Sequence, residues 1–332
     1  MNAGDIAFPH LGIYLKNVPK QFTVFGFNIA LYAIFIVIGV FLAVNLCERV
    51  AKRTGRDGDV YWDIYFPMVL VSVIGARIYY VIFSWDNYKN DLIRVFYIHE
   101  GGLAIYGGVI AGFLFVFFYA KWKKKKYLEL ADTIMFGLLV GQIIGRWGNF
   151  TNRECFGQYT DSLLAMRLPV DAVRAGEITD SIRAHMTAAT NYIQVHPTFL
   201  YESCWNLLLL SFLLFYVKKK KFDGEITLFY LGGYGLGRFF VEGLRTDQLQ
   251  LRNTGIAVSQ VLGISLFIFA TITEIVIRCR LKNAPVAVDE DAEEGLDKSS
   301  DEAPDTADDT AEDQKTEGPE EPVESGDAEG ES

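Results

Sequence analysis

Long apolar runs without charges alternate with short basic segments along most of the chain. The first run, 22–46, has 25 residues without a charge, and a membrane-crossing helix needs about 20. This run is too long for the core of a secretory signal and lacks a small-residue cleavage pattern. The pattern predicts seven membrane-spanning helices, at 22–46, 60–83, 101–120, 130–150, 197–217, 226–244 and 256–277.

The basic residues of the connections predict how these helices are oriented. Four Lys or Arg residues lie in 47–59, five in 121–126 and four in 218–221, and these are alternate loops. Cytoplasmic loops are enriched in Lys and Arg. We therefore predict an all-α, polytopic membrane protein with its N-terminus outside and its C-terminus in the cytoplasm. The long connection 151–196 then lies on the external face.

Charge divides the chain into two parts. Residues 281–332 hold 20 acidic residues and 3 Lys, whereas residues 1–280 hold 28 basic and 21 acidic residues. The acidic segment has no apolar period and cannot bury enough surface to fold. We predict a membrane domain at 1–280 and a disordered cytoplasmic tail at 281–332, which excludes a soluble enzyme. The four cysteines indicate neither a disulfide framework nor a metal motif.

Charged residues inside the predicted spans are candidates for function, because each costs at least about 2.5 kcal/mol to insert. Asp63, Asp132 and Glu274 lie within about a turn of a cytoplasmic helix end, where a side chain can reach water, and we interpret them as structural. The others fall in the outer thirds of their helices: Arg77, Arg146, Glu202, Arg238 and Glu242.

The depth of these residues favours a lipid ligand. At ~1.5 Å of rise per residue, Tyr106, Arg146, Glu202 and Arg238 are expected about 8 to 9 Å below the external helix ends. Phospholipid head groups and glycerol backbones lie at this depth. The prediction is therefore a site in the outer leaflet.

Arginines outnumber carboxylates at this level. Tyr234, Arg238, Glu242 and Arg245 recur at spacings of four, four and three, which places them on one helical face. The alternative is a buried ion pair between Arg238 and Glu242 that only packs helices. The surplus of cations instead favours a bound phosphate, since Arg77, Arg146, Arg238 and Arg245 stand against Glu202 and Glu242.

Glycines near these charges have two interpretations. The pairs 108/112, 141/145 and 233/237 have the spacing that lets membrane helices approach closely. The clusters at 101–102 and 107–108 are denser than packing requires, which favours a bend of the chain around a head group.

Four motifs occur in a specific order. The segment 145–157 reads Gly-Arg-x-Gly-Asn-Phe-x-Asn-x-Glu-x-x-Gly, and 101–108 reads Gly-Gly-x-x-x-x-Gly-Gly. His-Pro-Thr-Phe-Leu-Tyr-Glu follows at 196–202, and Tyr-x-x-x-Arg-x-x-x-Glu-x-x-Arg at 234–245. With these motifs the chain resembles the prolipoprotein diacylglyceryl transferase family, from about residue 10 to about residue 280.

The resemblance implies a reaction at the bacterial cell membrane. A diacylglyceryl group passes from phosphatidylglycerol to the lipobox cysteine thiol in the signal peptide of a preprolipoprotein. A thioether forms and glycerol phosphate leaves. We expect no cofactor, no metal and no nucleic acid, and membrane lipid as a further partner.

The matching positions give two groups of candidate residues. Arg146 and Arg238 are expected both to bind the phosphate and to stabilise the charge that accumulates on the leaving group. The further catalytic candidates are Tyr32, Asn149, Glu154, His196 and Glu242. The further substrate-binding candidates are Gly101, Gly102, Tyr106, Gly157, Tyr234 and Arg245.

Two positions leave alternatives open. Tyr106 stands where many members of the family have a histidine, and an unperturbed phenol has a pKa of ~10 against about 6.5 for imidazole. We therefore expect Tyr106 to bind a head group rather than to act as the base. His196 is the other proton acceptor, although His-Pro is also a suitable start for a helix.

Two other classes of protein compete with a transferase. Seven helices with intramembrane ion pairs also fit a transporter or receptor, but the chain has no internal repeat of the kind that many transporters show, and its polar groups gather at one leaflet. A membrane serine protease would need an element such as Gly-x-Ser-x-Gly, which is missing from the sequence. A transporter would leave phosphatidylglycerol intact.

Overall fold

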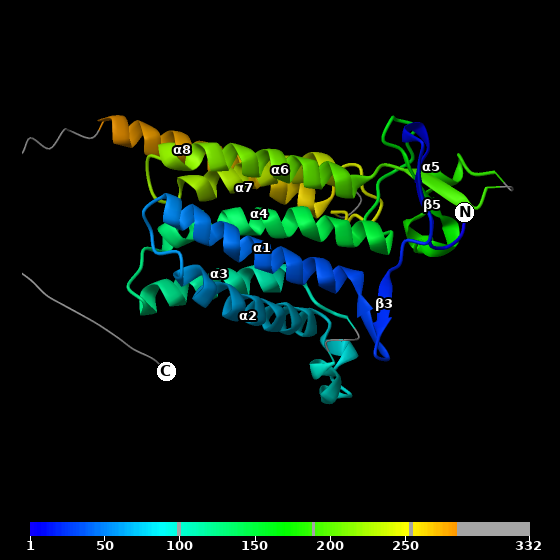
Figure 1. Cartoon of the computed structure of the whole chain (residues 1–332), viewed down its shortest axis with the longest axis horizontal. Coiled ribbons are helices and arrows are strands. Elements are labelled where there is room, and N and C mark those ends of the chain that lie inside the picture. Colours follow the sequence, from blue (N-terminus) through cyan, green and yellow to red (C-terminus); the bar gives the residue numbers. More distant parts are fainter. Residues whose placement is uncertain (98–100, 188–189, 252–254, 284–332) are drawn as a thin grey trace, which may run out of the picture. The chain divides into compact units, whose positions relative to one another are not determined.

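The computed structural model describes residues 1–97, 101–187, 190–251 and 255–283. Most of the predicted tail, 281–332, therefore lies outside the described residues. In the described part, long helices lie side by side, and a small β-sheet domain lies at one end of them (Figure 1). The helices are α1 (Leu31–Arg53), α2 (Val60–Phe83), α3 (Ile105–Trp122), α4 (Tyr127–Asn152), α6 (Thr198–Tyr216), α7 (Glu225–Glu242) and α8 (Val258–Asn283).

Six of these helices are long and apolar enough to cross a membrane: α1, α2, α3, α4, α6 and α8. The seventh predicted span, 226–244, is also a helix. This helix, α7, carries three charged residues, Glu225, Arg238 and Glu242, among its 18 residues, which is too many for it to be counted with the six apolar helices. The described residues thus support six spans, and the seventh stays a prediction.

The first predicted span begins too early. Residues 22–30 are apolar, but β3 (Gln21–Val24) and β4 (Phe27–Ala30) form an antiparallel hairpin there, and α1 begins only at Leu31. The two residues of the turn, Phe25 and Gly26, have φ of 50° and 83°. A two-residue turn with positive φ at both positions fits the twist of a hairpin. Hydropathy averaged over a window does not detect such a turn.

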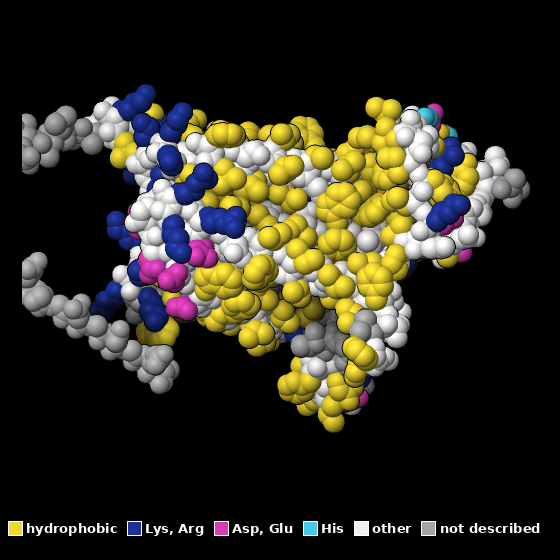
Figure 2. Space-filling model, in the orientation of Figure 1, with side chains coloured by type: hydrophobic (Ala, Val, Ile, Leu, Met, Phe, Trp, Pro, Cys, Tyr) yellow, Lys and Arg dark blue, Asp and Glu magenta, His cyan; other side chains and the backbone are white. Residues whose placement is uncertain are grey.

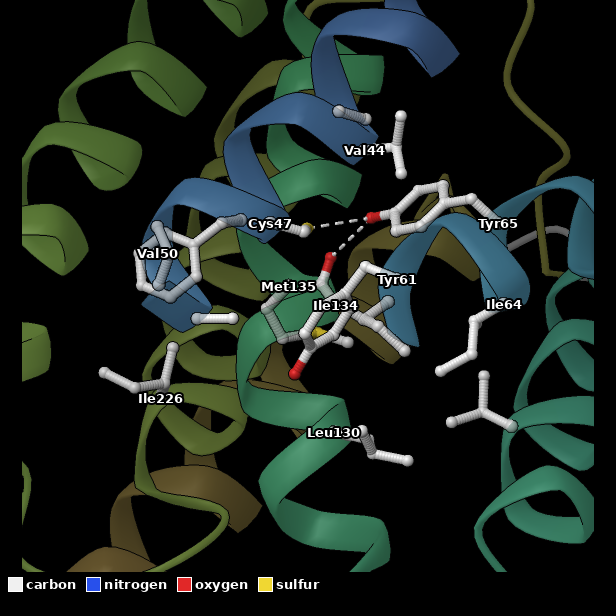
Figure 3. Packing of buried hydrophobic residues seen from close by; sticks show 14 of the residues in the cluster. Val44, Cys47, Val50, Tyr61, Ile64, Tyr65, Leu130, Ile134, Met135 and Ile226 are labelled. Atoms are coloured by element: carbon white, nitrogen blue, oxygen red, sulfur yellow. Dashed lines mark hydrogen bonds between the residues drawn. The ribbon is translucent and has the colours of Figure 1, made fainter. Parts of the chain in front are cut away.

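The helices pack around α4, which contacts α1, α3, α6 and α7. Figure 3 shows part of the apolar core, where Tyr65 of α2 lies between α1 and α4. The Tyr65 hydroxyl is 3.2 Å from Cys47 Sγ and donates to the carbonyl of Ile134 at 3.3 Å. Gly137 makes this contact possible, because a Cβ there would lie 1.9 Å from the Tyr65 hydroxyl.

The predicted glycine packing is only partly correct. A Cβ on Gly237 would lie 2.3 Å from Trp205 Nε1, so this glycine does allow α6 and α7 to approach. The pair Gly141 and Gly145 is different, because a Cβ on either would meet no neighbouring atom within 4 Å. These two glycines border open space.

The connection 151–196 folds together with the N-terminal segment. β1 (Ile6–Phe8), β2 (Ile13–Leu15), β5 (Met166–Pro169) and β6 (Tyr192–Val195) form one sheet in the order β2-β1-β5-β6, and the short helix α5 (Asp180–Arg183) contacts β6. The apolar core of this domain reaches the helices through Phe150 of α4 and Phe199 of α6, whose rings lie 4.6 Å apart. The prediction of an all-α protein is therefore only partly correct: the described residues are mostly helical, but the strands and the pairing of the N-terminal strands were not predicted.

The surface of the described part agrees with a membrane protein. Figure 2 shows hydrophobic side chains over the middle of the helices and Lys and Arg side chains gathered at the end opposite the sheet domain. Exposed apolar side chains include Val37, Leu70, Phe118, Leu208 and Phe215. Such contiguous apolar surface indicates contact with lipid.

Asp132 is structural, as interpreted, but its side chain is buried and does not reach water as its position suggested. The buried carboxylate of Asp132 accepts hydrogen bonds from Lys220 Nζ at 2.8 Å and from the backbone N–H groups of Gly224 and Thr227 at 2.9 Å. It therefore satisfies free N–H groups at the start of α7.

Candidate active site

The end of α4 brings the signature residues of 145–157 together. Arg146 and Asn149 are three residues apart on one helix face, and Arg146 Nη1 donates to Asn149 Oδ1 at 3.3 Å. Asn149 Nδ2 in turn donates to Glu154 Oε1 at 2.9 Å. The chain turns back at Arg153 and Cys155, which have φ of 57° and 58°. This turn is what places Glu154 beside the helix that precedes it.

Arg153 holds the turn in place. Its buried guanidinium donates from Nη2 to the carbonyls of Gly4 and Val18, both at 2.6 Å, and from Nη1 to the carbonyl of Thr151 at 2.9 Å. The N-terminal segment is thereby tied to the end of α4. Arg153 supports the signature without being part of the predicted motif.

Glu202 links the two predicted phosphate-binding arginines. Its Oε1 accepts from Arg146 Nη2 at 2.6 Å, and its Oε2 accepts from Arg238 Nη1 at 3.1 Å. The Glu202 side chain is 4% exposed, and the arginine side chains are 20% and 15% exposed. One buried carboxylate on α6 thus fixes guanidinium groups on α4 and α7.

The motif of α7 continues the network. Arg238 Nη2 also donates to Glu242 Oε2, and Arg245 Nη1 lies 3.8 Å from the same oxygen. Tyr234 interacts electrostatically with Glu202 and Arg238 and stacks on Tyr230 with ring centroids 5.5 Å apart. The helix ends at Glu242, so Arg245 lies in the following turn rather than on the predicted helical face.

Asp247 is a member of the network that the sequence analysis missed. Arg245 donates to it from Nε at 2.9 Å and from Nη2 at 2.7 Å, which is a bidentate pair. Burial alone would raise the pKa of Asp247, but the hydrogen bonds and the positive charge of Arg245, together with smaller hydrogen-bond contributions, lower it below its ordinary value. The sequence feature that indicates this pair is the position of Asp247, an acidic residue two positions after Arg245 in the connection that follows the predicted span 226–244.

Arg77 is not part of this network. Its guanidinium donates to the backbone carbonyls of Val95 at 2.8 Å, Gly101 at 2.7 Å and Gly102 at 3.0 Å, and also to those of Arg94 and Tyr97. Gly102 has φ of 73°, and a Cβ there would lie 2.6 Å from Arg77 Nη1. The structure therefore places Gly101 and Gly102 around Arg77.

The predicted surplus of cations is wrong for the described residues. Without Arg77 and with Asp247, three arginines pair directly with three carboxylates: Arg146, Arg238 and Arg245 with Glu202, Glu242 and Asp247. A fourth carboxylate, Glu154, joins the network through Asn149. Each guanidinium still has five N–H donors. The carboxylates occupy only part of this capacity.

The predicted common depth needs a correction. Arg146 precedes the end of α4 by six residues, or about 9 Å. Glu202 and Arg238 lie four residues, or about 6 Å, from the ends of α6 and α7. Tyr106 is the second residue of α3 and is 44% exposed. In the described residues no hydrogen bond joins Tyr106 to the charged network.

Gly157 and His196 belong to a backbone connection between the ends of three helices. Gly157 N donates to the carbonyl of His196 at 3.0 Å, and Gln158 N donates to the carbonyl of Leu244 at 2.8 Å. A Cβ on Gly157 would lie 2.7 Å from His196 Cβ and 2.9 Å from the Leu244 carbonyl oxygen. Only glycine fits there without displacing a neighbour.

His196 lies just before α6, as the His-Pro interpretation predicts, and Pro197 is the N-cap residue. Its Nδ1 is 3.1 Å from the Tyr201 hydroxyl. Burial lowers the pKa of His196, so the imidazole is neutral near neutral pH. A neutral imidazole can accept a proton.

Tyr32 covers the end of α4. It lies in the first turn of α1, and a Cβ on Gly148 would be 2.3 Å from its ring. Tyr32 interacts electrostatically with Glu154 and Arg146, which places it beside the signature. The thiol of Cys155 is close by, but burial raises its pKa to about 12, so it stays protonated.

The described residues contain no group of His, Cys, Asp and Glu arranged to hold a metal ion.

The fold and the site define a membrane protein with several spanning helices and one buried network of charged side chains near one end of them. Comparison with known proteins shows to which family it belongs. The sequence model described as "Prolipoprotein diacylglyceryl transferase" matches residues 19–276. The chain belongs to this family, as the motifs predicted, and it is a transferase.

Relatives of the chain carry the name phosphatidylglycerol–prolipoprotein diacylglyceryl transferase. The protein of Clostridioides difficile is 40% identical over 230 residues, which cover 69% of this chain and 84% of the relative. Those of Clostridium botulinum and Finegoldia magna are 39% and 38% identical over 76% of this chain, and over 94% and 93% of their own lengths. Family membership favours a transferase over the transporter and protease alternatives.

Proposed function

We propose that this chain transfers the diacylglyceryl group of phosphatidylglycerol to the lipobox cysteine of preprolipoproteins. The family and the names of the relatives support the two substrates. The structural observation that carries the proposal is Glu202, which holds Arg146 and Arg238 in one buried network. These guanidinium groups are the candidate phosphate clamp.

The reaction sets the chemical demands on the site. The cysteine sulfur attacks C3 of the glycerol that carries the two acyl chains. An S–C bond forms while the C–O bond to the phosphate breaks, and the bonding electrons leave with glycerol phosphate. The thiol proton passes to an acceptor, because the thiolate is the nucleophile. Cations at the phosphate stabilise the charge that the leaving group gains.

Arg146 and Arg238 meet this demand although their charges are balanced. Each offers a planar array of N–H donors that suits a phosphate, and Glu202 fixes both before a substrate arrives. An oriented cation loses less side-chain entropy on binding than a free one. Glu242, Asn149 and Glu154 keep the two guanidinium groups in position through the hydrogen bonds described above.

The remaining candidates surround this clamp or lie at the start of α3. Arg245 and Tyr234 interact with the charged groups of α7. Gly157 forms an isolated antiparallel β-bridge with Arg245. Tyr32 is proposed to act beside Glu154, and His196 as the proton acceptor. The exposed ring of Tyr106, with the bent backbone at Gly101 and Gly102, is proposed to contact the lipid head group.

We further propose that α7 is the seventh span and that the sheet domain lies outside the cell membrane. Glu225 and Glu242 of α7 are buried rather than exposed to lipid. Basic loops at the opposite end support a cytoplasmic position for that end. The site then faces the outer leaflet, where it meets phosphatidylglycerol and the membrane-bound signal peptide.

Thin-layer chromatography tests the activity. The purified protein is incubated with labelled phosphatidylglycerol and a lipobox peptide, and the label is expected to move to the peptide. A peptide with Ser in place of the lipobox Cys is the matched control. Intact lipid with the Cys peptide, in a preparation that is folded, contradicts the proposal.

A further inference from the structure

An uncharged polar layer lies one helical turn deeper than the charged network. Gln142 precedes Arg146 by four residues on α4, and Asn206 follows Glu202 by four residues on α6. Residues four apart lie above one another on a helix. Both amides therefore occupy the helix faces that carry the network, on its inner side.

The amides of this layer have unused hydrogen-bonding groups. Gln142 Nε2 donates to the Tyr230 hydroxyl of α7 at 2.7 Å. Gln142 Oε1 and both polar atoms of Asn206 are buried and have no hydrogen-bond partner among the described residues. Asn206 is 0% exposed. Exchanging its amide oxygen and nitrogen would not provide a hydrogen bond, because both atoms lack a partner.

The unused groups define the chemistry of a ligand. Buried amides without partners are destabilising, and native proteins rarely keep them so. A suitable ligand donates to Gln142 Oε1 and Asn206 Oδ1 and accepts from Asn206 Nδ2. The ester carbonyls of a lipid only accept, and a cation leaves Nδ2 without a partner. Water does both.

We propose that Asn206 and Gln142 bind ordered water on the inner side of the Arg146–Glu202–Arg238 network. This water keeps the deep side of the network solvated inside an apolar bundle. The proposal concerns a solvent site and does not depend on the transfer reaction.

An experimental structure tests the site directly. We suggest cryo-electron microscopy of the full chain in lipid nanodiscs, at a resolution that shows ordered water. An isolated density peak within hydrogen-bond distance of Asn206, about 2.7 to 3.2 Å, is expected. A region without a peak overturns the proposal, and so does density that continues into the glycerol backbone of a lipid.

Thermal unfolding gives an independent answer, because Asn206→Leu is expected to change Tm in opposite directions in a hydrated site and in a dry site. In a hydrated site Asn206→Leu expels the water and leaves Gln142 Oε1 unpaired, so Tm is expected to fall by about 2 to 4 °C. In a dry site the same change removes two unpaired groups, and Tm rises. An unchanged or raised Tm overturns the proposal.

Asn45→Leu is the matched control, because Asn45 Nδ2 already donates to the carbonyl of Phe41 on its own helix at 2.7 Å. Its Tm is expected to stay near that of the parent protein. If Asn206→Leu does not fold, Asn206→Ser keeps a donor and an acceptor, and the density peak of the unchanged protein decides.

Discussion

Glu202 of α6 accepts a hydrogen bond from Arg146 of α4 at 2.6 Å, although 56 positions of sequence separate the two residues. Their side chains are 4% and 20% exposed. Breaking a buried pair by removing one partner leaves an uncompensated charge. The pair therefore joins α4 to α6 and also fixes the direction of the Arg146 guanidinium, so both folding and the proposed phosphate site depend on it.

The position of Tyr32 leads to a prediction about two glycines of α4. Gly148→Ala places a Cβ 2.3 Å from the Tyr32 ring, so the ring must leave its position beside the signature. We expect the transfer rate to fall at least tenfold, as measured by the movement of label from phosphatidylglycerol to the lipobox peptide.

Gly141→Ala is the matched control for Gly148→Ala. Its Cβ meets no neighbouring atom within 4 Å, and Ala favours a helix over Gly by about 0.5 to 1 kcal/mol. We expect unchanged transfer and an equal or higher Tm. Equal activity in the two variants would contradict the role given to Tyr32.

His196 leads to a prediction about pH. Its folded-state pKa is lowered by burial from an ordinary value of 6.5, so the unfolded chain binds the proton first as pH falls. Stability is therefore expected to decline as pH falls through the window below 6.5. The transfer rate should decline there too, because a protonated imidazole accepts no proton.

His196→Gln separates catalysis from helix initiation. A proton acceptor that is lost lowers the rate commonly by about a hundredfold or more and removes the acid limb of the pH profile. If the variant keeps the parent rate and profile, His196 only begins α6, as the His-Pro interpretation states.

The orientation of the chain is testable by labelling. Ala175 is exposed in the sheet domain, and Lys123 is exposed in the basic loop between α3 and α4. In a background with the four native cysteines replaced by Ser, an impermeant thiol reagent on intact cells should label Ala175→Cys. Lys123→Cys should react only after the membrane is broken. The reverse pattern would show that the topology is inverted.

The acidic segment is expected to be dispensable. Truncation after Asn283, where α8 ends, removes a segment whose composition cannot form a packed core. Transfer activity per molecule in membranes should stay within about twofold of the full chain. A large loss at equal expression would assign the segment a role that its composition does not indicate.

The sequence predicted the helices better than it predicted their ends. Apolar runs located 60–83 as a span, and α2 has these bounds. The run at 22–46 was misjudged at its start, because the hairpin depends on backbone angles at Phe25 and Gly26 rather than on hydropathy. The pairing of β1 with β5 joins residues about 160 positions apart, and no local pattern reports such a contact.

The site was predicted from motifs but its charge balance was not. Arg146, Asn149, Glu154 and Arg238 lie in one network, as expected from their spacing and the family resemblance. The roles of Arg77 and Asp247 were missed. Arg77 was judged by its depth, whereas its partners are backbone carbonyls, which no sequence pattern displays.

The phosphate clamp is the central claim, and the rate of phosphatidylglycerol turnover in lysine variants tests it most directly. Arg146→Lys and Arg238→Lys keep the charge but lose the planar array of donors, and we expect each to lose about a hundredfold to a thousandfold in rate. Arg77→Lys is the control, expected to lower Tm while folded molecules keep their rate. Near-normal turnover in both clamp variants would contradict the account.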